Sequence, residues 1–151
     1  MASETVFRAG AEGDLAQIEA IVAAAYSVYV ERIGARPKPM DADYADALRE
    51  GVVWVAEIDE QVAGFVILRS APNLMLLENV AVSPAFQGRG LGRRFIAFAE
   101  ERARAAGVPK TILYTHVKMT ENVSLYRRHG FEVLEERTEH GLQRVYMEKA
   151  L

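Results

Sequence analysis

The sequence contains no cysteine. This excludes disulfide bonds, thiolate metal ligands and a catalytic thiol, and it is compatible with a reducing compartment. The N-terminal stretch "MASETVFRAGAEGD" also lacks the positively charged start and apolar core of a secretory signal. The longest apolar runs are far shorter than the roughly 20 residues that a membrane span needs. We therefore expect a cytoplasmic protein with no membrane partner.

The sequence also lacks an excess of positive charge. The 151 residues include 18 Lys and Arg against 21 Asp and Glu, which gives a formal net charge of −3. This balance argues against a generally basic surface, so we expect no nucleic-acid partner. The spacing of His, Asp and Glu suggests no metal site. The length suits a single domain, which we take to span residues 1–151.

The spacing of apolar residues predicts a strand, two helices, three strands, a helix, a strand, a helix and two strands. Asp14 is predicted to cap the first helix. The core face of that helix is formed by Leu15, Ile18, Ile21, Val22 and Ala25. The stretch "YVERIGARPKPMDADY" is expected to interrupt it, and a second helix is expected from Ala42 to Glu50.

The later elements follow from changes in hydrophobic period. Residues 52–58 and 62–70 form a hairpin that turns at Asp59 and Glu60, and "LMLLENVAV" is a strand stopped by Pro84. The next helix has an apolar stripe, with Glu100 and Arg104 paired on its solvent side. A strand at 111–117, a helix at 121–129 and a hairpin turning near 139–141 complete an α+β domain with a central mixed sheet.

The stretch "AVSPAFQGRGLGRRF" has glycine at every second position from 88 to 92. It lies between the predicted strand "LMLLENVAV" and the next predicted helix. A glycine-rich turn at the start of a helix presents unpaired N–H groups beside the positive end of the helix dipole. Together with the neighbouring arginines, this favours an anion site. No Gly-Lys-Ser/Thr follows, so the Walker pattern fails, and the glycine spacing also differs from the dinucleotide fingerprint.

The pattern Gln87-Gly88-Arg89-Gly90-Leu91-Gly92 resembles the acyl-CoA pyrophosphate loop of the GNAT superfamily of N-acetyltransferases. The stretch "TENVSLYRRHGF" lies where that superfamily has its second signature. The resemblance implies a mixed, mostly antiparallel central sheet. It also implies a V-shaped splay between two central parallel strands, and helices on both faces.

The resemblance also implies acetyl-CoA as the acyl donor, with no metal. The pantetheine arm would pair with the backbone of Val80, Ala81 and Val82. Asn122 could bond the pantetheine or cap its helix. The pyrophosphate would be held by residues of the loop and the helix start: Gln87, Gly88, Arg89, Gly90, Leu91, Gly92 and Arg93.

Acetyl transfer to an amine needs a base, an acid for the departing thiolate and a donor for the oxyanion. Tyr126 matches the tyrosine of the "LYxxxGF" signature and is the expected acid. Glu78 and His116 are the candidate bases, and water could act in place of either. A backbone N–H of Val80 or Val82 would serve the oxyanion.

The resemblance places a variable acceptor pocket at Tyr26, Tyr29 and Arg32, together with the final hairpin. It predicts an N-acetyltransferase that acts by direct attack in a ternary complex on a primary amine. The amine could belong to a small molecule, a peptide or a protein. A non-catalytic acyl-CoA-binding sensor is the alternative, and a homodimer is left open.

Overall fold

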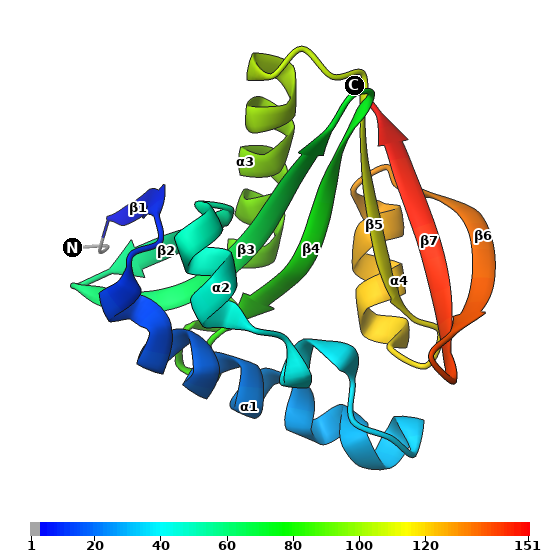
Figure 1. The fold of residues 1–151 in the computed structure, drawn as a ribbon, viewed down its shortest axis with the longest axis horizontal. Helices are drawn as coiled ribbons and strands as arrows, with labels where there is room; N and C mark the ends of the chain where they lie inside the picture. Colours follow the sequence, from blue (N-terminus) through cyan, green and yellow to red (C-terminus); the bar gives the residue numbers. More distant parts are fainter. Residues whose placement is uncertain (1–3) are drawn as a thin grey trace. The chain divides into compact units, whose positions relative to one another are not determined.

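The computed structural model describes residues 4–151 (Figure 1). Its α-helices and strands follow the predicted order. They are β1 (Thr5–Ala9), α1 (Leu15–Ile33), α2 (Tyr44–Glu50), β2 (Val53–Ile58), β3 (Gln61–Ala71), β4 (Leu74–Val82), α3 (Leu91–Ala105), β5 (Lys110–His116), α4 (Thr120–Arg128), β6 (Glu132–Glu139) and β7 (Leu142–Ala150). Short 3-10 turns occupy Glu12–Asp14, Lys38–Asp41 and Pro84–Phe86.

The seven strands follow the order β1-β2-β3-β4-β5-β7-β6. The pairs β1–β2, β2–β3, β5–β7 and β6–β7 are antiparallel. β4 and β5 are parallel, with Met75, Leu76 and Leu77 opposite Thr111, Ile112 and Leu113. The predicted α+β fold with a mixed, mostly antiparallel sheet is therefore confirmed.

The described residues divide into two compact units. The first comprises the chain up to Leu68 together with Asn79–Phe95, and the second comprises Arg69–Glu78 and Ile96–Leu151. Strands β3 and β4 and helix α3 each contribute residues to both units.

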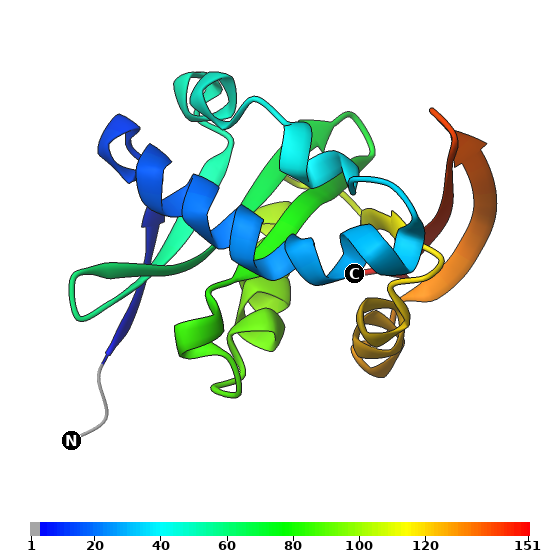
Figure 2. The same ribbon diagram turned by 90° about the horizontal axis from the view of Figure 1, so that it is seen from below.

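In the first unit, alternation along β3 sends neighbouring residues to opposite faces. Phe65 packs edge-on against Tyr44 of α2, with ring centroids 5.5 Å apart. The next residue back, Gly64, faces the Phe95 ring at the start of α3. Phe95 also packs edge-on against Phe7 of β1. This unit therefore has helices on both faces of its strands, as Figure 2 also shows for α1 and α3.

Helix α1 buries Ile18, Ile21, Val22 and Tyr26, whereas the predicted core residues Leu15 and Ala25 are only half-buried. The helix runs on through Ile33 and ends at Gly34, whose φ of 81° is left-handed. The interruption predicted from Tyr29 onward is therefore wrong for its first five residues. Gly34 is the residue that ends the helix, and the prolines of the stretch lie beyond it.

Asp14 stands at the N-cap position of α1, but its side chain does not cap that helix. Its carboxylate accepts the Ala11 N–H at 2.7 Å and two N–H groups of Arg8 at 2.8 and 2.9 Å. The predicted cap is thus wrong, because the carboxylate instead ties β1 to the turn before α1. The Arg8 hydrogen bond holds the pKa of Asp14 below its ordinary value.

In the second unit, α4 lies against one face of β5 and β7, and α3 lies on the same side of the sheet beside β3 and β4 (Figures 1 and 2). Leu113 and Met147 are buried on that side. Glu100 of α3 was expected on the solvent side, but its side chain is only 12% exposed. It pairs with Lys149 as well as with Arg104, so the expected helix pair exists within a half-buried network.

Both predicted hairpin turns are confirmed. Asp59 and Glu60 have φ values of 50° and 63° between β2 and β3. His140 and Gly141 have φ values of 51° and 76° between β6 and β7. Two successive left-handed residues form the turn whose twist matches that of the flanking strands.

Candidate active site

The glycine loop of the first unit connects the turn Pro84–Phe86 to α3. Gly88 and Gly90 have φ values of 82° and 75°, where an L side chain is strained. Gly92 instead lies within the first turn of α3. Two of the three glycines therefore adopt the left-handed conformation that the turn needs. The presence of glycine at position 92 is not explained by backbone conformation.

The start of α3 presents backbone donors beside this turn. The first helical hydrogen bond runs from the Arg94 N–H to the Gly90 carbonyl at 3.1 Å. Helix geometry leaves the amides of Leu91, Gly92 and Arg93 without intrahelical partners. These amides lie at the positive end of a 15-residue helix, so this segment can hold a phosphate or another anion.

Two arginines flank the loop on exposed positions. The Arg89 guanidinium lies 5.1 Å from the centre of the Phe86 ring, which steadies it over the turn. The Arg93 side chain lies next to Gly90, since its Nη2 is 3.4 Å from an ideal Cβ built there. Arg94 is instead drawn to the Phe7 ring at 5.3 Å. Arg89 and Arg93 are thus the side chains beside the glycine turn.

Strand β4 contains a kink immediately before the residues predicted to pair with pantetheine. Asn79 has a φ of 52°, although it lies inside the strand Leu74–Val82. A left-handed residue within a strand breaks its alternation, as in a β-bulge. Simple two-residue alternation therefore does not relate the side chains of Glu78 and Val80.

Tyr26 lies buried in the first unit and contacts this segment. Its hydroxyl donates a hydrogen bond to the Val80 carbonyl at 3.3 Å. Tyr26 was predicted to bind the acceptor, and its side chain is only 6% exposed. The contact makes it a positioning residue for the backbone of β4.

Gly64 brings β3 close to the same end of β4. An ideal Cβ at Gly64 would lie 2.7 Å from the Ala81 carbonyl oxygen and 3.0 Å from the Phe95 ring. The Ser83 N–H bonds the Ala63 carbonyl at 2.8 Å. Only glycine permits this approach, and sequence reasoning did not single it out.

The other predicted acceptor residues lie on the last turns of α1. The Arg32 guanidinium is 4.9 Å from the centre of the Tyr29 ring. Tyr29 is half-buried and Arg32 is exposed. The two predicted residues are thus brought together as a cation–aromatic pair.

Tyr126 lies on α4 in the second unit and packs edge-on against Phe131, with ring centroids 5.9 Å apart. Its side chain is buried, and burial raises the pKa of its phenol to about 12. The phenol therefore stays protonated through the physiological range. It is a weaker acid than the unperturbed tyrosine assumed from the sequence.

Asn122 lies one turn before Tyr126 and is half-buried. The N-cap of α4 is Met119, and the Asn122 N–H donates to the Met119 carbonyl at 3.0 Å. Asn122 is therefore inside the helix, and the alternative that it caps the helix is wrong.

Glu78 is held by an ion pair within the second unit. The Arg69 Nε donates to Glu78 Oε2 at 2.8 Å, and the Glu78 side chain is 22% exposed. The fixed guanidinium orients the carboxylate. A carboxylate oriented in this way is a candidate proton acceptor.

His116 ends β5 and is half-buried. Its Nδ1 accepts the Lys118 N–H at 3.1 Å, so the neutral ring carries its proton on Nε2. Burial, followed by the charges of Lys118 and Arg144, lowers the pKa of His116. The ring is therefore neutral near pH 7, yet its one lone pair is already used by the backbone.

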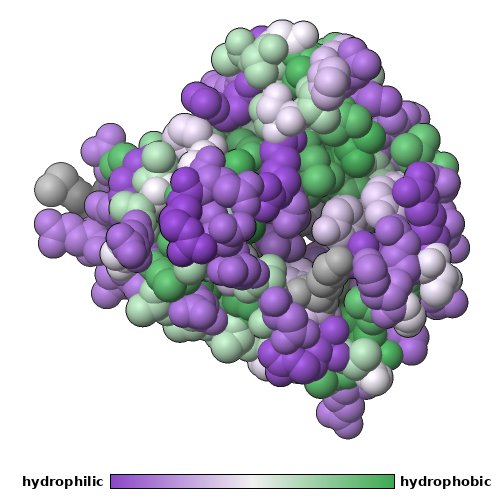
Figure 3. All heavy atoms as spheres, viewed as in Figure 1, coloured by the Kyte–Doolittle hydropathy of each residue, from purple (hydrophilic) through white to green (hydrophobic). Residues whose placement is uncertain are grey.

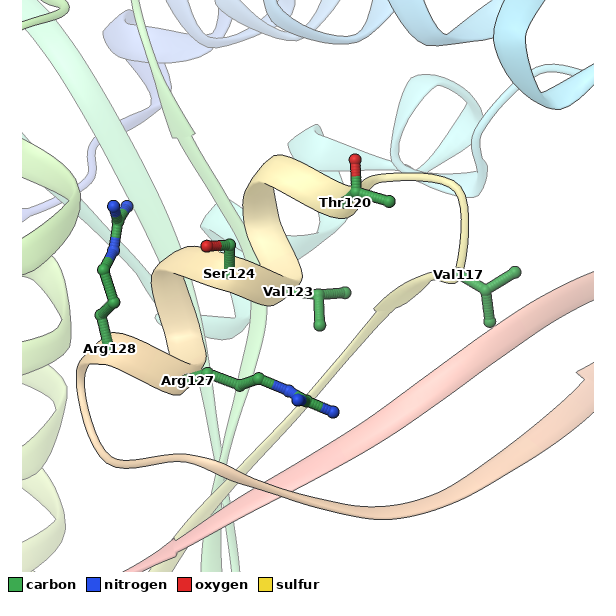
Figure 4. A pocket seen from close by; sticks show the side chains of 6 residues that line it. All are labelled: Val117, Thr120, Val123, Ser124, Arg127 and Arg128. Carbon is green, nitrogen blue, oxygen red and sulfur yellow. The ribbon is translucent and has the colours of Figure 1, made fainter.

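A hollow of about 500 Å³ lies against α4 in the second unit (Figure 4). It is lined by Val117, Thr120, Val123, Ser124, Arg127 and Arg128. The two arginine side chains leave the last turn of the helix in different directions. Neither Asn122 nor Tyr126 is among the lining residues, so the hollow differs from the predicted catalytic position.

Sequence reasoning missed a group of side chains on β5 and β7. Tyr114 and Tyr146 have ring centroids 5.4 Å apart, and Arg144 lies over the Tyr114 ring at 4.6 Å. The signal was present in "LQRVYMEKA", where Val145 and Met147 alternate with Arg144 and Tyr146. Apolar residues at every second position predict that the intervening residues share the opposite face.

Comparison with known proteins identifies the family. Residues 16–131 match the Acetyltransferase (GNAT) family, and the chain belongs to this family. A mycothiol acetyltransferase of Corynebacterium glutamicum is 33% identical over 95 residues, which cover 62% of this chain and 32% of that protein. An uncharacterised N-acetyltransferase of Bacillus subtilis is 28% identical over 87 residues, which cover 57% of this chain and 56% of that protein. The chain thus matches about a third of the length of the first of these relatives and about half of the second.

A solved structure supports the fold. The PaiA N-acetyltransferase of Thermoplasma acidophilum, in complex with coenzyme A, superposes with a TM-score of 0.78. The alignment covers 98% of this chain and 99% of that one at 17% identity. At this identity the likeness concerns the fold.

Two further findings concern the described residues alone. No helix among them has the length and apolar character needed to cross a membrane. Within residues 4–151, no group of three or more His, Cys, Asp or Glu side chains is arranged to hold a metal ion.

Proposed function

We propose that the chain is one N-acetyltransferase domain that transfers the acetyl group of acetyl-CoA to a primary amine. The observation that carries the proposal is the loop of the first unit. Gly88 and Gly90 turn the backbone into α3, whose first amides lack intrahelical partners, and Arg89 and Arg93 flank the turn. This combination suits a pyrophosphate, and it stands at the position of the family's acyl-CoA loop.

In the proposed reaction the amine nitrogen forms a bond to the acetyl carbon as the bond from that carbon to sulfur breaks. The proton lost by the amine passes to Glu78, directly or through water. Tyr126 gives its proton to the departing sulfur. The ion pair with Arg69 orients Glu78 for this role, whereas the lone pair of neutral His116 is engaged by Lys118.

Substitution tests this division of labour between the two candidate bases. Glu78→Gln should lower kcat by roughly 100-fold, a usual contribution of general-base catalysis. His116→Asn keeps an acceptor for the Lys118 N–H and should retain activity within about threefold. Loss of activity in His116→Asn with an unchanged Glu78→Gln would reverse the assignment.

Binding of the donor is tested by thermal shift with acetyl-CoA, ATP and NAD. A ligand at 100 times its dissociation constant stabilises a protein by about 2.7 kcal/mol. We expect acetyl-CoA to raise the midpoint of the wild type. Gly90→Glu should abolish this response, because a carboxylate would stand where the pyrophosphate binds.

Gly141→Glu is the matched control, since Gly141 has a φ of 76° against 75° for Gly90. Both substitutions impose similar backbone strain, but Gly141 lies in the β6–β7 turn. The control should keep the acetyl-CoA response. An equal loss in both variants, or no response of the wild type, would refute the assignment of the loop.

A non-catalytic acyl-CoA sensor would also pass the binding test. Release of free thiol from acetyl-CoA with a broad panel of amines separates the two functions. Tight binding without any amine-dependent thiol release would favour the sensor.

A further inference from the structure

Arg144 is a buried cation on the face of the second unit that is opposite to α3 and α4. It lies on β7, directly across from His116 of β5 and Arg137 of β6. Its side chain is 7% exposed. Figure 3, viewed onto this side, shows hydrophilic residues gathered over β6 and β7.

The hydrogen bonds of Arg144 are incomplete. Its Nη1 lies 3.9 Å from Glu139 Oε1, an ion-pair distance that is too long for a good hydrogen bond. Its Nη2 is fully buried and has no hydrogen-bond partner. A buried charged donor without a partner is costly, so this atom calls for a partner outside the described protein groups.

Aromatic and charged side chains surround Arg144. The Tyr114 ring lies 4.6 Å beneath its guanidinium, and Tyr146 packs against Tyr114. Glu139 accepts the Tyr146 hydroxyl, so this carboxylate is committed to two neighbours. The Arg137 guanidinium lies over the Tyr146 ring, 4.7 Å from its centre.

Charges on neighbouring strands define the rest of the site. Glu135 pairs with Arg137 on β6, and Glu78 of β4 pairs with Arg69 of β3. Lys118 follows β5, where its backbone N–H holds the His116 ring. Both Arg144 and Glu78 act electrostatically on the Tyr114 phenol, so a cation and an anion both lie near that group.

We infer that Arg144 binds a carboxylate of the acceptor, so that the acceptor is an amine that also bears a carboxylate. The inference rests on the proposed function and names its substrate class. The planar guanidinium matches a carboxylate, and the partnerless Nη2 supplies a donor. Glu139 lies close enough to disfavour a dianionic phosphate or phosphonate. Glu78 supplies the opposite charge toward which the ammonium group of such an acceptor would be drawn.

Acetyl transfer to matched pairs of amines provides the test. Each pair consists of an L-amino acid and its carboxamide, with thiol release from acetyl-CoA as the assay. Aminoalkylphosphonic acids form a third set. We expect kcat/KM to be at least 10-fold higher for the carboxylates than for their amides. The amides have the less basic and therefore more readily deprotonated amines, so amine ionisation alone would produce the opposite order.

Arg144→Gln should lower kcat/KM for the best carboxylate by roughly 10- to 100-fold, the usual cost of losing a charge-assisted hydrogen bond. The loss should appear mainly in KM, and the amides should be unaffected. Arg104→Gln is the matched control, because it removes an exposed arginine of the second unit that lies outside this site, and it should preserve the preference for carboxylates.

Equal turnover of acids and amides by the wild type, or better turnover of phosphonates, would overturn the inference. So would an unchanged preference in Arg144→Gln, which would mean that water alone satisfies Nη2. The wild-type comparison stands even if the variant does not fold. Failure of the proposed function has a different signature, namely no thermal shift with acetyl-CoA or no transfer to any amine.

Discussion

The Tyr26 hydroxyl donates a hydrogen bond to the Val80 carbonyl across 54 positions of sequence. This bond connects the middle of α1 to the part of β4 that follows the left-handed Asn79. A kinked strand has lost some regular ladder contacts, so an anchor from a helix helps to fix its backbone. The geometry of β4 thus depends on a side chain far from it in sequence.

Removing only this hydroxyl tests its role. Tyr26→Phe should lower the free energy of unfolding by about 1 kcal/mol, because one net hydrogen bond is lost. It should also weaken acetyl-CoA binding by more than this mild destabilisation would suggest. Urea unfolding and titration calorimetry measure the two effects. Unchanged affinity would mean that the bond stabilises the fold without setting the donor site.

The close approach of β3 and β4 at Gly64 predicts that one added methyl group there lowers the free energy of unfolding. Gly64→Ala should destabilise the protein by about 1–3 kcal/mol, since the new Cβ meets the Ala81 carbonyl and the Phe95 ring. Gly13→Ala is the control, because no atom lies within 4 Å of its ideal Cβ. That control should be neutral or more stable by up to about 1 kcal/mol. Similar stability of the two variants would show that β4 shifts without cost.

The raised pKa of Tyr126 predicts the shape of the pH profile. An acid must be protonated to act, so activity that depends on this phenol is lost only as pH rises through its pKa of about 12. A decline of kcat below pH 10 should therefore persist in the Tyr126→Phe variant. The same variant should lower kcat by roughly 100-fold or more. Full activity of Tyr126→Phe would remove the phenol from the mechanism.

The lowered pKa of Asp14 predicts that its contribution to the free energy of unfolding depends on pH. Its pKa is lowered in the folded state, so its contribution is present above the ordinary value of 3.8 and is lost as pH falls through the folded value. Asp14→Asn should cost about 2 kcal/mol at pH 7, because the carboxylate bonds to Arg8 and Ala11. The difference from the wild type should shrink below pH 3.8. A difference that stays constant from pH 7 to 3 would contradict the assignment.

Most elements were predictable because their signals are local. Short apolar runs bounded by turn signals defined β2 to β4, and polar residues between such runs marked the turns at Asp59–Glu60 and His140–Gly141. The extension of α1 was missed because its end depends on Gly34 rather than on the polar composition of its last turns. The N-cap at Asp14 was wrong because Arg8, from the preceding strand, competes for the carboxylate.

The residues of the candidate site that belong to a short sequence motif were predictable. The contacts that depend on packing between distant residues were not. The glycine loop and Tyr126 stand within short signatures. The burial that raises the pKa of Tyr126, and the hydrogen bond from Tyr26 to Val80, depend on residues distant in sequence. Arg144 could have been placed on a face by alternation, but its missing partner is visible only in three dimensions.

The division of the chain into two units has a consequence for dissecting the protein. The polypeptide passes between them three times, after Leu68, Glu78 and Phe95. A fragment that keeps all of the first unit runs to Phe95 and therefore includes Arg69–Glu78 of the second. A fragment that keeps all of the second unit starts at Arg69 and therefore includes Asn79–Phe95 of the first. Neither half can be isolated by truncation, and separating them would require rejoining the chain in a new order.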